Sequence, residues 1–135
     1  MSEAPSTDME LPPYAQSLGM HVAQMEGGLP LIACDAGELA LGRPGFWHGG
    51  VIGGLLEIAA LGAIRAKLGI DGNRLKTVNI TVQFMRSAPA GRAYAIGTIE
   101  RAGRRLVNVT AAAWQEDRNR HIASAQLTVL IKPEE

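Results

Sequence analysis

The chain has 135 residues, of which 47% are hydrophobic and 19% charged, so it can form one compact domain with a core. Thirteen acidic residues balance thirteen lysines and arginines, which excludes the basic excess typical of proteins that bind nucleic acids or membrane surfaces. The single cysteine, Cys34, excludes an internal disulfide and fits a reducing compartment.

The N-terminal residues Met1 to Pro13 carry acids and prolines but no basic residue. They lack the charged start and apolar stretch of a signal peptide, so we expect a cytoplasmic protein. We predict a flexible tail over residues 1–13 and a single domain over residues 14–135.

Three short elements are predicted next. Tyr14 to Gly19 is expected to form a short helix that ends at its glycine. Met20–Met25 and Leu29–Cys34 are expected to be strands of a hairpin whose turn is Gly27-Gly28. Residues 35–43 are expected to form a loop or a partial strand.

The stretch from Val51 to Ile64 contains one polar side chain, that of Glu57. A segment that is apolar on every face predicts a buried helix or a membrane span. It is too short for a span, which needs roughly 18 apolar residues. We therefore predict a buried helix that begins near Gly49, after the turn at Pro44-Gly45, and ends before Gly69.

After residues 71–74 the hydrophobic period changes to two. Val78, Ile80, Val82 and Phe84 alternate with polar residues, which predicts a half-buried strand. Three more strands are predicted over residues 92–101, 104–114 and 121–131. Four consecutive antiparallel strands beside one apolar helix indicate an α+β fold, with a strongly curved sheet wrapped around the helix.

Two features of the predicted helix indicate chemistry. Gly49 and Gly50 present backbone N–H groups at the helix N-terminus, where they suit an oxyanion or a polarised carbonyl oxygen. Glu57 is a candidate general base or nucleophile, because apolar surroundings make a carboxylate more reactive. The alternatives are that the glycines only turn the chain and that Glu57 is paired with an arginine or backbone amides.

The spacing of these residues predicts an assembly. Gly49 and Glu57 are eight residues apart, which is about 12 Å along a helix. A donor and a base that act on one carbonyl must both lie about 3 Å from it, so they would have to come from two chains. Two antiparallel helices related by a two-fold axis would bring them together in an obligate dimer with two shared sites.

Three glycines inside the predicted helix, Gly53, Gly54 and Gly62, each cost about 1 kcal/mol relative to alanine. Close approach of another helix, or room for a thin ligand arm, would offset this cost. A sheet backbone that crosses tightly over the helix is the alternative explanation.

The order of the elements and one motif resemble a known family. The motif is Gly45-x-x-His48-Gly49-Gly50-x-x-x-x-Leu55-x-Glu57-x-Ala59. Together with the strand over residues 77–86 and the hairpin at Gly103-Arg104-Arg105, it resembles the hotdog-fold acyl-CoA thioesterases of the PaaI-like group. The resemblance covers residues 20–131 and implies a homodimer, often a dimer of dimers, that hydrolyses thioesters at the shared helix interface.

The resemblance also implies residue roles. Gly49 would donate its N–H to the thioester carbonyl, His48 would shape that pocket, and Glu57 of the partner chain would activate water or attack directly. Thr77 falls where the family often has a hydroxyl that helps place the water. The chain departs from the family at Gly42, where many members have Asn six positions before the histidine.

Further residues are candidates for binding an acyl-CoA substrate. The acyl pocket is expected to be lined by Phe46, Trp47 and Leu61, and Gly50 is a second backbone donor. Arg86, Arg104 and Arg105 suit the phosphates of coenzyme A, although a solvated strand edge is the alternative for each. No metal or nucleotide cofactor is implied, because metal-ligand spacings and phosphate loops do not occur in the sequence.

Thioester hydrolysis competes with two other functions. One is a dehydratase or hydratase of the same fold, which would place its histidine well before the helix. The other is a non-catalytic acyl-CoA-binding protein, which the glycine at position 42 keeps open.

Overall fold

The computed structural model describes residues 9–134, so most of the predicted tail, Met1 to Asp8, lies outside the described residues. The helices and strands are α1 (Pro13–Ser17), β1 (His21–Glu26), β2 (Leu29–Asp35), α2 (Gly49–Leu68), β3 (Leu75–Phe84), β4 (Arg92–Ala102), β5 (Leu106–Trp114) and β6 (Ala123–Ile131). Short 3₁₀ turns lie at Glu38–Ala40 and Gly72–Arg74. The predicted order of a hairpin, a long helix and four strands is confirmed.

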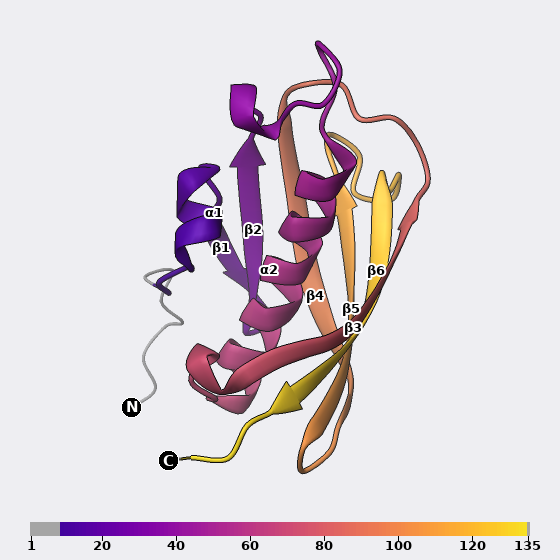
Figure 1. Cartoon of the computed structure of the whole chain (residues 1–135). Coiled ribbons are helices and arrows are strands. Elements are labelled where there is room, and N and C mark those ends of the chain that lie inside the picture. The colour runs from indigo at the N-terminus through magenta and orange to yellow at the C-terminus, as the bar shows by residue number, and fades with distance from the viewer. Residues whose placement is uncertain (1–8, 135) are drawn as a thin grey trace.

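The strands of the described residues form one antiparallel sheet in the order β1-β2-β4-β5-β6-β3. Figure 1 shows that α2 lies across one face of this curved sheet, while β1 and β3 form its two edges. The turn between β1 and β2 has positive φ at Gly27 (58°) and Gly28 (82°), which is the twist that two-residue hairpins need. The predicted α+β arrangement is therefore confirmed.

Small residues let α2 lie directly on the sheet. A Cβ placed on Gly97 of β4 would be 2.8 Å from the Ala59 carbonyl oxygen and 2.9 Å from the Ala60 Cα. Ala95 on β4 and Ala111 on β5 are buried on the same core. The backbone of the helix thus approaches the sheet more closely than larger side chains would permit.

α2 begins and ends where the sequence predicts, and both of its ends are capped. His48 caps the N-terminus through its side chain. Gly69 takes the left-handed conformation at the C-terminus (φ 64°), and its N–H donates to the Arg65 carbonyl at 3.0 Å. Arg65 and Lys67 lie in the last turns, where positive charges suit the helix dipole.

The prediction that α2 is covered on every face is wrong for the single chain. Glu57 and Leu61 are only partly buried, and they share one stripe of the helix with Gly53 and Arg65. The sheet covers the opposite side of α2, where Ala59, among others, is fully buried. We call the stripe of Gly50, Gly53, Gly54, Glu57, Leu61 and Arg65 the open face of α2.

The alternation predicted for β3 is interrupted. A register shift between Thr77 and Asn79 inserts one residue, so Val78 loses its place in the alternation. Beyond the bulge, Ile80 lies opposite the buried Leu127 and therefore points to the helix side of the sheet. Yet Val78 is 51% exposed, Ile80 39% and Phe84 57%, so β3 is an apolar edge strand rather than a half-buried one.

The end of the predicted tail packs on the domain. Leu11 is buried, and the Glu10 carbonyl accepts a hydrogen bond from Arg65 at 2.8 Å. α1 begins at Pro13, one residue before the predicted start of the short helix. Within residues 9–134, none of the helices has the length and apolar character needed to cross a membrane.

Candidate active site

The N-terminus of α2 is closed by His48. Its Nδ1 accepts the Gly50 N–H at 2.9 Å, and its own backbone N–H donates to the Ala40 carbonyl at 2.8 Å. Because Nδ1 is the acceptor, the ring proton of neutral His48 lies on Nε2, which is left as a donor. The N–H of Gly50, predicted to bind substrate, is therefore occupied by the cap.

Gly49 keeps an available donor. None of the hydrogen bonds among the described residues uses its N–H, although the N–H groups of Gly50, Val51 and Ile52 all have acceptors. The Phe84 ring lies beside it, since a Cβ on Gly49 would be 3.5 Å from two ring carbons. An unpaired N–H at a helix N-terminus, next to an apolar ring, suits a carbonyl oxygen that becomes negative.

Gly42, the position that departs from the family pattern, lies against this cap. A Cβ at position 42 would be 3.3 Å from the His48 Cα and 3.4 Å from its Cδ2. The Gly42 N–H donates to the Phe46 carbonyl at 3.1 Å. The Cβ of an asparagine at position 42 would thus contact His48. With glycine at this position, the chain lacks a polar side chain beside the N-terminus of α2.

Glu57 lies two turns along the open face, and a tyrosine from α1 lies beside it. A Cβ on Gly54 would overlap the Tyr14 Oη and lie 2.8 Å from its Cε2, so the phenol rests on the bare Gly54 backbone. Burial and the negative charge of Glu57 raise the pKa of Tyr14, so the hydroxyl is protonated at neutral pH. Sequence reasoning missed Tyr14, and the costly glycine at position 54 was its only signal.

Thr77 presents an unsatisfied hydroxyl. It lies opposite the fully buried Val129, which places its side chain on the helix side of the sheet. Its Oγ1 is buried and has no hydrogen-bond partner among the described residues. A buried hydroxyl without a partner costs about 1–3 kcal/mol, so a bound water or substrate at this point would satisfy it.

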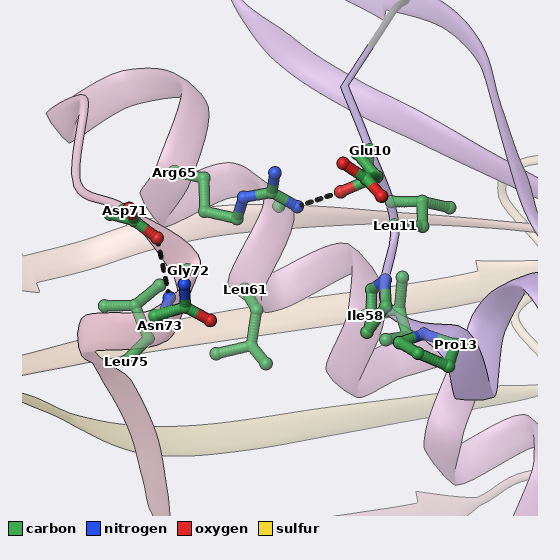
Figure 2. Close-up of a pocket in the computed structure, with 12 residues that line it drawn as sticks. Glu10, Leu11, Pro13, Ile58, Leu61, Arg65, Asp71, Gly72, Asn73 and Leu75 are labelled. Carbon is green, nitrogen blue, oxygen red and sulfur yellow. Dashed lines mark hydrogen bonds between the residues drawn. The ribbon is translucent and has the colours of Figure 1, made fainter.

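One of the three predicted acyl-pocket residues lines a cavity of the described residues. Leu61 does so, together with Ile58 and Leu75, in a cavity of about 440 Å³ on the C-terminal half of the open face. Figure 2 shows these apolar side chains beside Arg65, which reaches across to Glu10.

The other two predicted pocket residues lie elsewhere. Trp47 is 6% exposed and donates its indole N–H to the Gly91 carbonyl at 3.1 Å, so it anchors the loop before α2. Phe46 lies under the Arg43 guanidinium, 4.0 Å from ring centroid to Cζ. Both precede the helix, about 18 Å along its axis from Leu61, so one chain cannot place all three in one pocket.

The three arginines predicted to bind phosphate do not lie together. Arg86 follows β3 near the start of α2, and its Nε donates to the His121 carbonyl at 2.8 Å. Arg104 and Arg105 lie in the β4–β5 hairpin at the other end of the molecule (Figure 1), where they line a cavity of about 520 Å³ with Arg101. Within residues 9–134, none of the three hairpin arginines forms an ion pair.

Comparison with known proteins decides the family. Residues 44–121, which span the start of α2, Glu57 and the strands β3 to β5, match the family described as the thioesterase superfamily. The chain belongs to the thioesterase superfamily. No curated protein matches it by sequence.

Solved structures of the thioesterase superfamily share the fold. A phenylacetic acid degradation-related protein from Ralstonia eutropha JMP134 is 26% identical with a TM-score of 0.78, and the match covers 92% of this chain and 93% of that one. A thioesterase family protein from Silicibacter pomeroyi is 22% identical with a TM-score of 0.79, covering 91% of each chain. A mutant of the phenylacetic acid degradation protein PaaI from Thermus thermophilus is 21% identical with a TM-score of 0.76, covering 89% of this chain and 99% of that one.

The curved sheet around one long helix is the hotdog fold of this superfamily, so the fold and the resemblance to the PaaI-like group are both confirmed. Within the thioesterase superfamily fold, the features that this chain offers for chemistry are the free Gly49 N–H, the His48 cap, the Glu57 carboxylate and the orphaned Thr77 hydroxyl. They lie at separate places along the helix side of a single chain.

Proposed function

We propose that the protein hydrolyses an acyl-CoA or aroyl-CoA thioester to the free acid and CoA, at two sites shared between two copies of the chain. One observation carries this proposal. A single helix presents a free N–H donor at Gly49 and, about 12 Å further along an uncovered face, the Glu57 carboxylate. A second helix, antiparallel and related by a two-fold axis, would complete both sites.

The surface available to a second copy supports the dimer. β3 is an edge strand with free backbone groups, and it exposes Val78, Ile80 and Phe84. This apolar edge adjoins the open face of α2, since a Cβ on Gly53 would be 3.8 Å from the Val82 side chain. An apolar strand edge beside a half-covered helix is a surface that a monomer seldom leaves exposed.

The proposed reaction balances without a cofactor. Glu57 of one chain takes a proton from water while the water oxygen forms a bond to the thioester carbonyl carbon. The oxyanion of the tetrahedral intermediate accepts the Gly49 N–H of the other chain. The C–S bond then breaks, and the CoA thiolate recovers the proton from Glu57. Direct attack by Glu57, followed by hydrolysis of the anhydride, uses the same groups.

The two parts of the substrate, the acyl group and CoA, would be bound by different residues. The acyl group would enter the cavity at Leu61, which lies one turn beyond Glu57 on the open face. The CoA phosphates would meet Arg104 and Arg105, whose guanidinium groups suit phosphate oxygens. Because the hairpin lies far from Gly49 of its own chain, these arginines would serve the site that uses the partner's Gly49.

Thiol release from a panel of CoA thioesters tests the proposal. Free thiol should appear in proportion to protein, with acyl and aroyl thioesters ranked by their fit to the Leu61 cavity. Conversion of enoyl- or hydroxyacyl-CoA without thiol release would instead indicate a hydratase or dehydratase. Tight binding of acyl-CoA without turnover would indicate a non-catalytic binder.

Substitution of Thr77 by valine should separate activity from stability. The valine keeps the shape and removes an unsatisfied hydroxyl, so the free energy of unfolding should be unchanged or rise by about 1–3 kcal/mol. If the hydroxyl places the attacking water, kcat should fall about tenfold. Denaturant unfolding and thiol release measure the two effects.

Thr128→Val is the matched control for Thr77, because the Thr128 hydroxyl bonds Asn108 at 3.2 Å and is assigned no part in the site. It should leave kcat unchanged. A Thr77→Val protein that is less stable but fully active would contradict the assigned function of this hydroxyl.

Substitution of Ile80 by glutamate should dissociate the dimer. Each interface would gain two negative charges on a surface that has to be apolar, so the protein should sediment as a monomer and lose thioesterase activity together with the dimer. Thr81→Glu, one residue along on the opposite face of β3, adds the same charge and should stay dimeric. Dimeric Ile80→Glu protein in analytical ultracentrifugation would exclude this surface as the interface.

A further inference from the structure

Tyr14 is a polar side chain near Glu57 that the function above does not use. It belongs to α1, which packs against α2, and its ring tip lies on Gly54, three residues before Glu57 on the same face. The hydroxyl has no hydrogen-bond partner among the described residues, although the Tyr14 carbonyl accepts from Ser17. Tyr14 is 47% exposed, so solvent reaches the phenol, and its hydroxyl is free to donate to the nearby Glu57 carboxylate.

The glycine beneath the phenol adds a second observation. Gly54 lies in the middle of a helix, where glycine costs about 1 kcal/mol relative to alanine. The three atoms nearest to a methyl group at this position would all belong to the tip of the Tyr14 side chain. The glycine therefore serves to admit the phenol to the open face of α2, next to Glu57.

The charge of Glu57 acts on the phenol directly. The pKa of Tyr14 is raised first by burial, then by Glu57 on α2 and by Cys34 on β2. The charged carboxylate thus favours the protonated form of the hydroxyl, which can then act as a hydrogen-bond donor. Hydrogen bonds of catalytic groups are often long in the free enzyme and tighten when substrate binds.

We infer that Tyr14 is a positioning residue. When substrate binds, its hydroxyl donates a hydrogen bond to one oxygen of the Glu57 carboxylate and leaves the other oxygen aimed at the attacking water or thioester. This inference rests on the proposed thioesterase function and adds an α1 residue to its site. The bond fixes the carboxylate in one orientation, which pre-organises the proton transfer or attack. α1 thereby becomes part of the catalytic apparatus.

A double-mutant cycle tests the inference through kcat and KM for CoA thioester hydrolysis. Tyr14→Phe keeps the ring on Gly54 and removes only the donor, so kcat should fall about tenfold while KM stays within about twofold. In the Glu57→Gln background the same substitution should cost less than about twofold, because the group that Tyr14 positions is already lost. The other tyrosine supplies the control: Tyr94→Phe, on β4 against Trp114, should leave both constants unchanged.

Gly54→Ala gives an independent test. Its methyl group would displace the phenol while improving helix propensity, so kcat should fall toward the Tyr14→Phe value without a loss of thermal stability. Wild-type kcat in Tyr14→Phe, or the same loss in both backgrounds, would overturn the inference while leaving hydrolysis by Glu57 intact. Full activity of Glu57→Gln alone would instead overturn the proposed function, and this inference with it.

Discussion

Glu57→Gln is expected to lower kcat for thioester hydrolysis by at least about a hundredfold, the usual scale for loss of a positioned acid–base group. Glutamine has the same shape as glutamate but cannot take a proton from water or attack a thioester. Because Glu57 is only partly buried in the single chain and forms no hydrogen bond with the described residues, the substitution should leave the fold intact. Thiol release under saturating substrate measures kcat, and circular dichroism checks the fold.

Glu116→Gln is the matched control for this experiment. It makes the same chemical change in the exposed loop after β5, and kcat should stay at the wild-type value. Equal rates for Glu57→Gln and the wild-type protein would refute the assigned function of this carboxylate. A fall in both variants would point to a general effect of charge rather than to a site.

Gly49→Pro is expected to abolish hydrolysis while preserving the helix. Proline lacks only the N–H that the proposal uses, and it is favoured at the first position of a helix. The preceding residue, His48, already has the extended conformation (φ −72°, ψ 130°) that a following proline demands. Loss of an oxyanion donor costs about 10²–10³ in kcat. Gly49→Ala keeps the N–H and should lose much less.

Mixing the two inactive proteins tests whether the sites are shared. A dimer of one Glu57→Gln chain and one Gly49→Pro chain carries one site with both defects and one site with neither. Random exchange of subunits by co-expression or refolding should therefore restore about a quarter of the wild-type activity. No recovery, with dimer exchange confirmed by mass, would show that each chain builds its site alone.

The bounds and type of the long helix could be predicted from the sequence because local signals agree there. An apolar run, the turn at Pro44-Gly45 and a glycine beyond Leu68 all indicate one helix over Gly49–Leu68. The period of two in the later strands was sufficient to predict a sheet that curves around the helix. It did not give the strand order, in which β3 pairs with β6 and β4 with β2. The apolar run did not reveal that one face of α2 stays open. A helix face that packs on a sheet and one that packs on a partner chain both need apolar residues, so the sequence pattern is the same for both.

The finer features of the site depend on contacts that the sequence does not encode locally. One inserted residue at Val78 moves β3 out of its alternation, and no turn residue marks the bulge. Tyr14 reaches Gly54 across 40 positions of chain, and Trp47 donates its indole N–H to the carbonyl of Gly91, which follows two elements later. The pairing of Gly50 with His48 is local, yet a sequence cannot tell which of two adjacent amides the cap will use.

The bare backbone at Gly97 has a consequence for the way in which this protein could evolve. In the proposed dimer, α2 contributes the Gly49 amide to one reaction centre and the Glu57 carboxylate to the other. The position of this one helix therefore sets the geometry of both centres. A side chain at position 97 would collide with the helix backbone and push α2 away from the sheet, which would misalign both proposed reaction centres. Substitutions around the cavity at Leu61 could therefore change substrate preference more easily than substitutions in the part of the sheet that packs against α2.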